Sequence, residues 1–441
     1  MPGAGPLFGG ARRRARGRLD IVAAMRRLPL LTLLAAAIAT AAGLSACGSD
    51  DTPPPKSTPS PTTPTTDGST SATTTTLPAP RAYTKNTTRL DAADPTGVAA
   101  LTALTMYPST ARDLRPDAVT FAGADDWRSI LLASSFAAKP LGFPLLLMDG
   151  RNLPPVSAAT LAQLQPGGAP SMNKAQGLRI GVSTRPANDL RTRYLTSATP
   201  AGLARAADRQ LQRLRGSASA RVIVVNSDDP KSAAPAAAWA ARSGDPILFT
   251  GSGTLPADTK AALQSHSNPR IYVVGGPDTV SRFVISQLQE YGTVKRIQPA
   301  EATGGPSDLS IAFARYSDND FGFNYRDIGH GFVFASTNDP ISAMAAAALS
   351  SGGNYGALLF VDRPGHIEQP LKSFLLDVQP GYDDSHPPTQ GFYNRGWIVG
   401  ATTAISVQTQ ARIDGLLEIT RTDSANQLGD TSTNAANTGT P

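Results

Sequence analysis

Short runs of apolar residues alternate with alanine-rich segments from about residue 88 to residue 420. The runs 145–147, 222–225 and 247–249 are apolar throughout and lack the alternation of a strand with one face in water. Segments of helical length, such as 129–138 and 233–242, separate these runs. Continuous apolar strands separated by helices are typical of buried parallel strands in βαβ units. The pattern predicts an α/β fold with mostly parallel sheets.

The same order of features occurs three times. In each copy an apolar run is followed by polar residues and then by an aspartate, at Asp126, Asp229 and Asp339. The spacings between these aspartates are 103 and 110 residues. A helix, a second apolar run, another helix and a third run follow each aspartate. The extra residues of the third copy fit an insertion around 321–327. A period near 100 is too long for a solenoid and is typical of a small α/β domain, so we predict three tandem modules.

Composition sets the limits of these modules. Residues 48–82 are almost entirely Pro, Ser and Thr, which bury too little apolar area to offset the entropy of ordering. We therefore predict a disordered linker there and a disordered tail at 421–441. The predicted modules are 83–190, 191–295 and 296–420.

Residues 1–47 have the parts of a secretory signal peptide. A pair of arginines precedes the apolar run 28–44, and small residues precede Cys47, the one cysteine of the chain. Met25 stands where such a signal would start, so translation could begin there. The residues Leu44-Ser45-Ala46-Cys47 resemble the bacterial lipobox. That resemblance implies lipidation of Cys47, for example with palmitate, and a protein anchored on the outer face of the cell membrane that reaches into the wall.

The positive charge of the sequence belongs to this leader. The chain has 40 basic and 34 acidic residues, a net charge of +6. Residues 1–47 hold seven of the basic residues and one of the acidic ones, which leaves 33 of each from residue 48 onward. The mature chain thus gives no sign of a nucleic-acid partner, and none is predicted. An anionic partner would need locally concentrated positive charge.

The three copies share short motifs. The second copy carries Asp229-Pro230, Pro246-Ile247-Leu248-Phe249, Leu255-Pro256 and Val273-Val274-Gly275-Gly276. The third keeps Asp339, Leu358-Leu359 and Val399-Gly400. The first keeps Asp126 and Pro144-Leu145-Leu146-Leu147, while Gly181-Val182-Ser183 matches the double-glycine turn poorly. Together these motifs resemble the cell wall-binding repeat 2 family of wall-associated proteins of Gram-positive bacteria.

The resemblance covers about residues 88–420 and carries several implications. It implies three modules about a pseudo-threefold axis and non-covalent binding to an anionic secondary cell-wall polymer or peptidoglycan. Members of the family usually carry a separate effector domain and no lipid anchor, and this chain departs on both points. Physically the apolar strands are core strands, and the resemblance alone links them to wall association: Leu145, Leu146, Leu147, Ile247, Leu248, Phe249, Leu358, Leu359 and Phe360.

Positive charge is most concentrated between residues 179 and 221, which hold nine arginines and two aspartates. Arginine forks match the oxygens of phosphate and carboxylate groups. A solvated helix face is the alternative for any single arginine. The predicted polymer-binding residues are Arg179, Arg185, Arg191, Arg193 and Arg296.

Two recurring features have a binding and a structural interpretation. Asp126, Asp229 and Asp339 stand where a strand ends and a helix begins, the edge at which α/β proteins bind ligands. A proline follows two of them, which favours helix N-caps over metal ligands. Gly275-Gly276 could cradle a phosphate, but no Lys-Ser/Thr continuation follows, so a tight turn is favoured. No metal site and no cofactor are predicted.

The sequence contains no catalytic constellation that we recognise. Its four histidines, His266, His330, His366 and His386, show no ligand spacing, and no Gly-x-Ser-x-Gly motif accompanies them. We therefore expect a protein that is not an enzyme. The main alternative is a solute-binding lipoprotein of a transporter, which predicts two lobes around one cleft. A wall hydrolase would need an acid pair or a nucleophile that we do not find.

Overall fold

The computed structural model describes residues 83–422 except 109–110, 187–188, 302 and 353–355. All of these residues belong to one compact unit. The predicted signal peptide with Cys47, the predicted linker 48–82 and the predicted tail from residue 423 onward lie outside the described residues.

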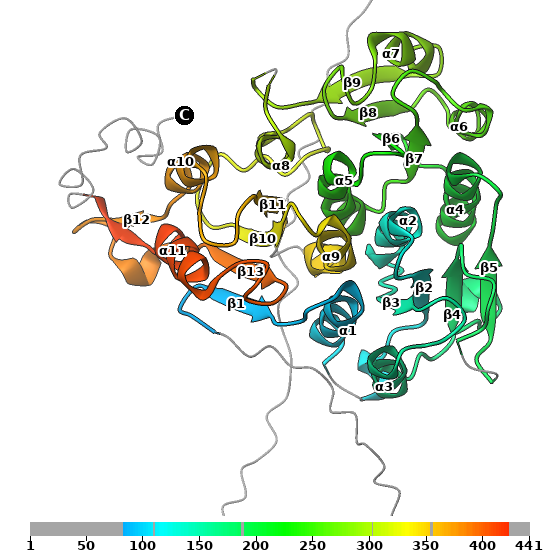
Figure 1. The fold of residues 1–441 in the computed structure, drawn as a ribbon, viewed down its shortest axis with the longest axis horizontal. Coiled ribbons are helices and arrows are strands. Elements are labelled where there is room, and N and C mark those ends of the chain that lie inside the picture. The colour runs from blue at the N-terminus through cyan, green and yellow to red at the C-terminus, as the bar shows by residue number, and fades with distance from the viewer. Residues whose placement is uncertain (1–82, 109–110, 187–188, 302, 353–355, 423–441) are drawn as a thin grey trace, which may run out of the picture. The chain divides into compact units, whose positions relative to one another are not determined.

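Three four-stranded parallel sheets form the framework (Figure 1). The first sheet has the order β3-β2-β4-β5, with β2 (Val119–Gly123), β3 (Leu145–Met148), β4 (Gly177–Ile180) and β5 (Thr192–Leu195). The second has the order β7-β6-β8-β9, with β6 (Arg221–Asn226), β7 (Ile247–Thr250), β8 (Arg270–Val274) and β9 (Thr293–Ile297). The third has the order β11-β10-β13-β1, with β1 (Thr87–Leu90), β10 (Gly331–Ser336), β11 (Leu358–Val361) and β13 (Arg395–Val399). The short strands β12 (Gly381–Tyr382) and β14 (Thr420–Arg421) form a separate parallel pair.

The fourth strand of each sheet comes from a different repeat. β5 begins the second repeat but pairs with β4 of the first, and β9 pairs in the same way with β8. β1 closes the cycle because it pairs with β13 of the third repeat, with Arg89 opposite Ile398. The three repeats therefore interlock through exchanged strands. The predicted boundary between residues 295 and 296 falls inside β9.

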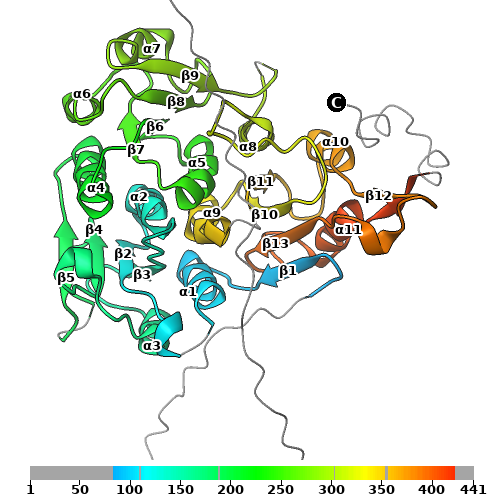
Figure 2. The same ribbon diagram turned by 180° about the vertical axis from the view of Figure 1, so that it is seen from behind.

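Three alanine-rich helices pack against one another where the repeats meet (Figures 1 and 2). They are α2 (Trp127–Ala137), α5 (Pro230–Ser243) and α9 (Pro340–Ala345). In α5 every residue from Ser232 to Ala241 is buried, so this helix has no solvated face along that stretch. Small side chains let such helices approach closely, which explains their alanine content. This arrangement confirms the predicted α/β class and the pseudo-threefold order.

A second set of helices covers the sheet edges. α1 (Pro95–Met106), α4 (Pro200–Arg215) and α8 (Pro306–Arg315) each follow an exchanged strand. They pack on the edge strands β3, β7 and β11, and each also contacts a central helix of another repeat, in the pairs α1 with α9, α4 with α2 and α8 with α5. This cover hides backbone groups that would otherwise form an open sheet edge.

The remaining helices lie on the periphery. α3 (Pro155–Leu164), α6 (Ala257–Leu263) and α10 (Gln369–Asp377) pack beside α1, α4 and α8. α7 (Arg282–Leu288) follows β8, and α11 (Val407–Leu417) follows β13. Short 3₁₀ turns are η1 (Arg112–Leu114), η2 (Pro170–Met172), η3 (Ala347–Gly352) and η4 (Pro388–Gln390). In the first repeat the described residues between β4 and β5 contain no helix.

The apolar motif strands lie in the core. They form most of β3, β7 and β11, and none of the nine side chains is more than 7% exposed. Such residues cannot touch a polymer from the surface. They can therefore affect wall association only by stabilising the modules. The nine residues are Leu145, Leu146, Leu147, Ile247, Leu248, Phe249, Leu358, Leu359 and Phe360.

The insertion of the third repeat joins that repeat to the second. The ring of Phe321 stacks on Tyr272 with centroids 3.5 Å apart and lies 4.8 Å from the ring of Trp239. The carboxylate of Asp320 forms ion pairs with Arg221 and Arg270 of the second repeat. The acidic character of this insertion thus complements two arginines across the junction.

Candidate binding site

Arg296 closes the turn that follows β8. Its two terminal nitrogens donate to the carbonyl oxygens of Gly275 and Val280, each at 2.7 Å. Gly275 has a φ of +114°, a backbone conformation that glycine adopts without strain, and the carbonyl of Gly276 accepts from Val280 N at 3.0 Å. Burial, followed by the charge of Arg282, lowers the pKa of Arg296. Arg296 therefore stabilises the turn after β8, and Gly275-Gly276 lies in that turn.

Arg89 plays the same part in the third sheet. Its terminal nitrogens donate to the carbonyls of Gly400 at 2.8 Å and Ile405 at 2.7 Å, and its Nε donates to Oε1 of Gln410 at 3.0 Å. The side chain is fully buried, and burial lowers its pKa. Because these bonds satisfy main-chain oxygens that water cannot reach, this arginine holds the turn after β13 in place.

In the first sheet, the arginine that bonds to main-chain carbonyls comes from a different strand. Tyr194 occupies the position of Arg89 and Arg296, and the arginine is Arg179 on the neighbouring strand β4. Arg179 donates to Oγ1 of Thr192 at 3.0 Å and to the carbonyl of Ser183, and its guanidinium lies 4.7 Å from the centre of the Tyr194 ring. Its side chain is buried, so the predicted polymer-binding residue Arg179 mainly supports the loop after β4.

The three recurrent aspartates cap helices. Oδ1 of Asp229 accepts from Ser232 N at 3.1 Å, and Oδ1 of Asp339 accepts from Ser342 N at 3.0 Å. Asp126 accepts from two amides of α2. No group of three His, Cys, Asp or Glu side chains among the described residues could hold a metal ion.

Three of the five predicted arginines come together beside the first sheet. Arg185, Arg191 and Arg193 line a pocket of about 350 Å³, which we call the basic pocket. Nη2 of Arg191 donates to the carbonyl of Asn173 at 2.9 Å, which fixes one side of the opening. Apolar residues complete the lining: Met172, Ala175 and Leu190.

The basic pocket lies where the described residues between β4 and β5 form no helix. In the second and third repeats the equivalent segments fold into α7 and α11. In the first repeat this segment is a loop that supplies Arg185, Asp189 and Leu190 to the pocket. The pocket therefore belongs to the first sheet, at the junction of the first and second repeats.

A larger cleft of about 1010 Å³ adjoins the basic pocket. Its lining includes Arg112, Arg115 and Arg151, and it shares Asp189 and Leu190 with the basic pocket. We call this space the adjoining cleft. Sequence reasoning missed it because its arginines come from two stretches outside the arginine-rich run and meet only through the tertiary fold.

The other arginines of the run have separate roles. Arg205 pairs with Asp258 at 3.1 Å, and Arg221 pairs with Asp245 at 3.0 Å. Arg209 and Arg213 are exposed on α4 and line a separate pocket of about 390 Å³. That pocket has two arginines, whereas the basic pocket and the adjoining cleft together have six.

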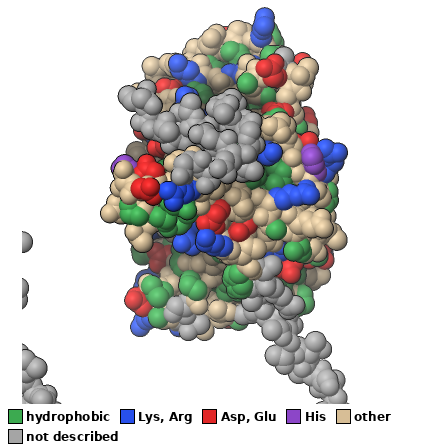
Figure 3. Space-filling model, turned by 90° about the vertical axis from the view of Figure 1, so that its left-hand side faces the viewer, with side chains coloured by type: hydrophobic (Ala, Val, Ile, Leu, Met, Phe, Trp, Pro, Cys, Tyr) green, Lys and Arg blue, Asp and Glu red, His purple; other side chains and the backbone are tan. Residues whose placement is uncertain are grey.

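The arginines at the basic pocket and adjoining cleft contrast with those elsewhere. Within the part of the chain that the structure describes, five of them form no ion pair: Arg112, Arg151, Arg185, Arg191 and Arg193. On the face that carries the third repeat, basic and acidic side chains are interspersed (Figure 3). In that repeat Arg315 pairs with Asp377. The basic pocket thus brings three arginines together without ion-pair partners among the described residues.

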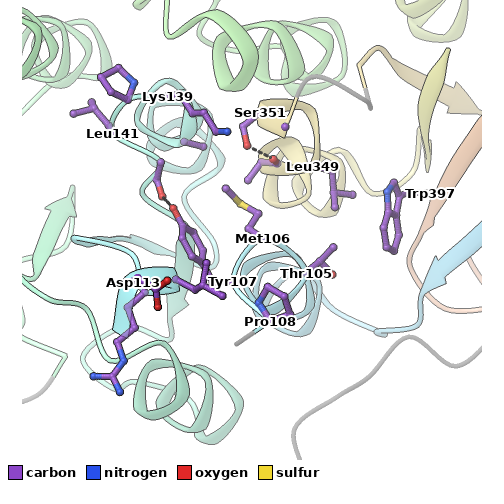
Figure 4. Close-up of a pocket in the computed structure, with 17 residues that line it drawn as sticks. Thr105, Met106, Tyr107, Pro108, Asp113, Lys139, Leu141, Leu349, Ser351 and Trp397 are labelled. Atoms are coloured by element: carbon purple, nitrogen blue, oxygen red, sulfur yellow. Dashed lines mark hydrogen bonds between the residues drawn. The ribbon is translucent and has the colours of Figure 1, made fainter. Parts of the chain in front are cut away.

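An apolar cavity of about 680 Å³ lies between the first and third repeats (Figure 4). Met106, Leu141, Leu349 and Trp397 line it, with Lys139 among its few charged side chains. It does not separate two lobes. The two-lobed architecture expected of a solute-binding lipoprotein is therefore wrong for this chain, which has three sheets built on one plan.

No helix in the described part of the chain is both long and apolar enough to span a membrane.

Comparison with known proteins finds a family match for the second repeat. Residues 191–285 match the family described as cell wall binding domain 2. This confirms the resemblance in the repeat whose motifs are most complete.

Solved structures share the fold. Cwp6 from Clostridium difficile has a TM-score of 0.57 at 15% identity, over 76% of this chain and 48% of that one. Cwp8 from the same organism has a TM-score of 0.56 at 15% identity, over 75% of this chain and 52% of that one. The chain thus spans about half the length of these structures. Over 76 residues it is also 36% identical to a Bacillus subtilis protein named amidase enhancer, which is 17% of this chain and 11% of that protein.

Proposed function

We propose, from the membership of residues 191–285 in the cell wall binding domain 2 family, that this chain is a lipid-anchored, non-catalytic protein that binds an anionic polymer of the cell wall. The family and the shared fold support association with the cell wall. The anionic nature of the polymer, the lipid anchor and the absence of catalysis are our inferences.

The observation that carries the proposal is the basic pocket beside the first sheet. Three exposed guanidinium groups surround one opening and form no ion pair with described residues. Each can form paired hydrogen bonds with a phosphate or carboxylate group. A single exposed charge pair contributes only about 0.2–1 kcal/mol, so useful affinity requires several contacts along one polymer.

The proposed lipid anchor depends on Cys47 and on the linker that follows it. A lipid on Cys47 would hold the N-terminus at the outer face of the membrane. The 35 residues from 48 to 82 are rich in Pro, and an extended polyproline II chain of that length spans on the order of 100 Å. Such a spacer would let the folded repeats reach polymer inside the wall.

Two measurements test the proposal. The full chain carrying Cys47→Ser should sediment with purified cell-wall sacculi at low salt, and failure to sediment would remove the binding claim. The wild-type chain grown with radiolabelled palmitate should carry label that Cys47→Ser abolishes. Label that persists in this variant would exclude Cys47 as the lipidated residue. Measurable turnover of peptidoglycan by the purified chain would contradict the non-catalytic part.

A further inference from the structure

The lining of the adjoining cleft combines three kinds of side chain. Arg112 and Arg151 are exposed and supply positive charge. Asn152, Gln165 and Gln176 supply neutral hydrogen-bonding groups. The apolar part of the lining includes Leu153, Leu161 and Leu190.

Contacts within the fold hold two apolar side chains and one amide of this cleft in place. Leu153 and Leu161 pack against a buried cluster that includes Phe121 and Leu146. Nε2 of Gln176 donates to the carbonyl of Pro166 at 3.0 Å, so this amide cannot turn freely. A preformed site loses less entropy on binding than one that must order its side chains.

This combination suits the chemistry of a sugar ring. The C–H face of a pyranose packs on apolar side chains, its hydroxyls bond to amides, and an anionic substituent pairs with guanidinium groups. The volume of about 1010 Å³ lies at the upper end of the range for small-molecule sites, which leaves room for more than one sugar.

Asp189 determines the spacing of charge. It lines both the basic pocket and the adjoining cleft and is exposed, so it borders two spaces that each contain arginines. A carboxylate repels a second anion but accepts hydrogen bonds from hydroxyls. A neutral sugar is therefore favoured beside Asp189, with anionic groups on either side of it.

We propose that the basic pocket and the adjoining cleft form one site for an acidic oligosaccharide whose anionic units are separated by a neutral sugar beside Asp189. This inference rests on the proposed function and specifies the polymer class that the site accepts. The anionic group is a carboxylate or a phosphate, because arginine forks match both.

Calorimetric titration of the full chain carrying Cys47→Ser distinguishes these chemistries. The probes are a hyaluronan hexasaccharide, in which glucuronate alternates with a neutral sugar, a phosphodiester-linked mannose oligomer, and an oligogalacturonate in which every unit is charged. We expect at least one of the first two probes to bind about tenfold more tightly than the oligogalacturonate. The tighter of the two identifies carboxylate or phosphate as the anionic group. Equal or tighter binding of the oligogalacturonate would overturn the proposed spacing.

Three variants test the residues. Arg112→Gln/Arg151→Gln should weaken binding of the preferred probe at least about tenfold, while the matched Arg209→Gln/Arg213→Gln on α4 should leave it unchanged. Asp189→Asn should strengthen binding of the oligogalacturonate relative to the alternating probes. Circular dichroism melting checks that each variant is folded. Full affinity in folded Arg112→Gln/Arg151→Gln would overturn the inference.

The sedimentation assay separates this inference from the proposed function. If the unsubstituted chain sediments with sacculi and Arg112→Gln/Arg151→Gln sediments equally well, the inference falls and wall binding stands. If the chain binds an alternating probe but does not sediment with sacculi, the oligosaccharide site stands and the proposed function falls.

Discussion

The guanidinium of Arg89 donates a hydrogen bond of 2.8 Å to the main-chain carbonyl of Gly400, 311 positions further along the chain. This bond joins the first strand of the folded region to the turn after the last strand of the third sheet. Because β1 completes that sheet, the two ends of the folded region stabilise each other. The interlocking of the three repeats is therefore cyclic.

Replacing Arg89 by alanine should destabilise the protein strongly. The change leaves the carbonyls of Gly400 and Ile405 buried without their donor, and each unsatisfied buried acceptor costs about 1–3 kcal/mol. We expect Arg89→Ala to lower the free energy of unfolding by about 3 kcal/mol or more in urea titrations. The exposed Arg412→Ala should change it by less than about 0.5 kcal/mol. Similar losses in both variants would show that the buried turn does not carry this stability.

The insertion of the third repeat should matter for the junction with the second. Phe321 is fully buried and contacts Trp239 and Tyr272 across that junction. Phe321→Ala should lower the free energy of unfolding by about 3–5 kcal/mol and change the fluorescence of Trp239. Phe283→Ala, at a ring that is 63% exposed, is the control and should have little effect. An unchanged unfolding midpoint for Phe321→Ala would contradict the interface.

Stability should depend on pH through a buried pair in the second repeat. Nε2 of His266 lies 3.1 Å from Oδ2 of Asp208, and Nδ1 lies 2.8 Å from the carbonyl of Ser219. Burial lowers the pKa of His266, but the hydrogen bonds to Asp208 and Ser219 outweigh it, so the net pKa is raised. A raised pKa in the folded state contributes stability that is complete below about pH 6.5 and is lost as pH rises through the folded pKa.

Thermal unfolding of wild type beside His266→Gln across this range measures the effect. The difference in free energy of unfolding between the two proteins should shrink as pH rises. A difference that is constant with pH, or that grows as pH rises, would contradict a charged His266 in the folded protein.

Binding to sacculi should weaken with salt. Exposed arginines interact with anions through charges that salt screens, and the screening length falls from about 10 Å at 0.1 M to about 3 Å at 1 M. We expect the sedimented fraction of the Cys47→Ser chain to fall steeply between about 0.05 M and about 0.5 M NaCl. Retention that does not change with NaCl would indicate apolar or hydrogen-bonded recognition instead.

Much of the fold follows from local patterns in the sequence. Continuous apolar runs predicted the buried parallel strands, and the aspartates before alanine-rich helices correspond to the caps Asp126, Asp229 and Asp339. The exchange of β1, β5 and β9 between sheets could not be predicted. A strand that pairs within its own repeat and one that pairs with a neighbouring repeat have the same local pattern. Only the packing of all three repeats determines which sheet each strand joins.

The candidate site was only partly predictable for a related reason. The sequence identified Arg185, Arg191 and Arg193 because they lie close together in an arginine-rich run. It also grouped Arg179 and Arg296 with them, although both bond to main-chain carbonyls of the segments that follow β4 and β8. Sequence cannot distinguish an arginine that bonds to buried carbonyls from one that faces solvent. It also cannot bring Arg112 and Arg151 to the same cleft, since α1, η1 and α3 are arranged by the tertiary fold.

Sedimentation with sacculi of a charge-reversed pair tests the central claim most directly. Arg191→Glu/Arg193→Glu reverses two charges of the basic pocket, and Arg209→Glu/Arg213→Glu reverses two exposed charges on α4, so the net charge changes equally. The account predicts that the first variant is lost from the sacculi at low salt while the second is retained like the unsubstituted chain. Equal retention of the two variants, or loss of both, would contradict binding through the basic pocket.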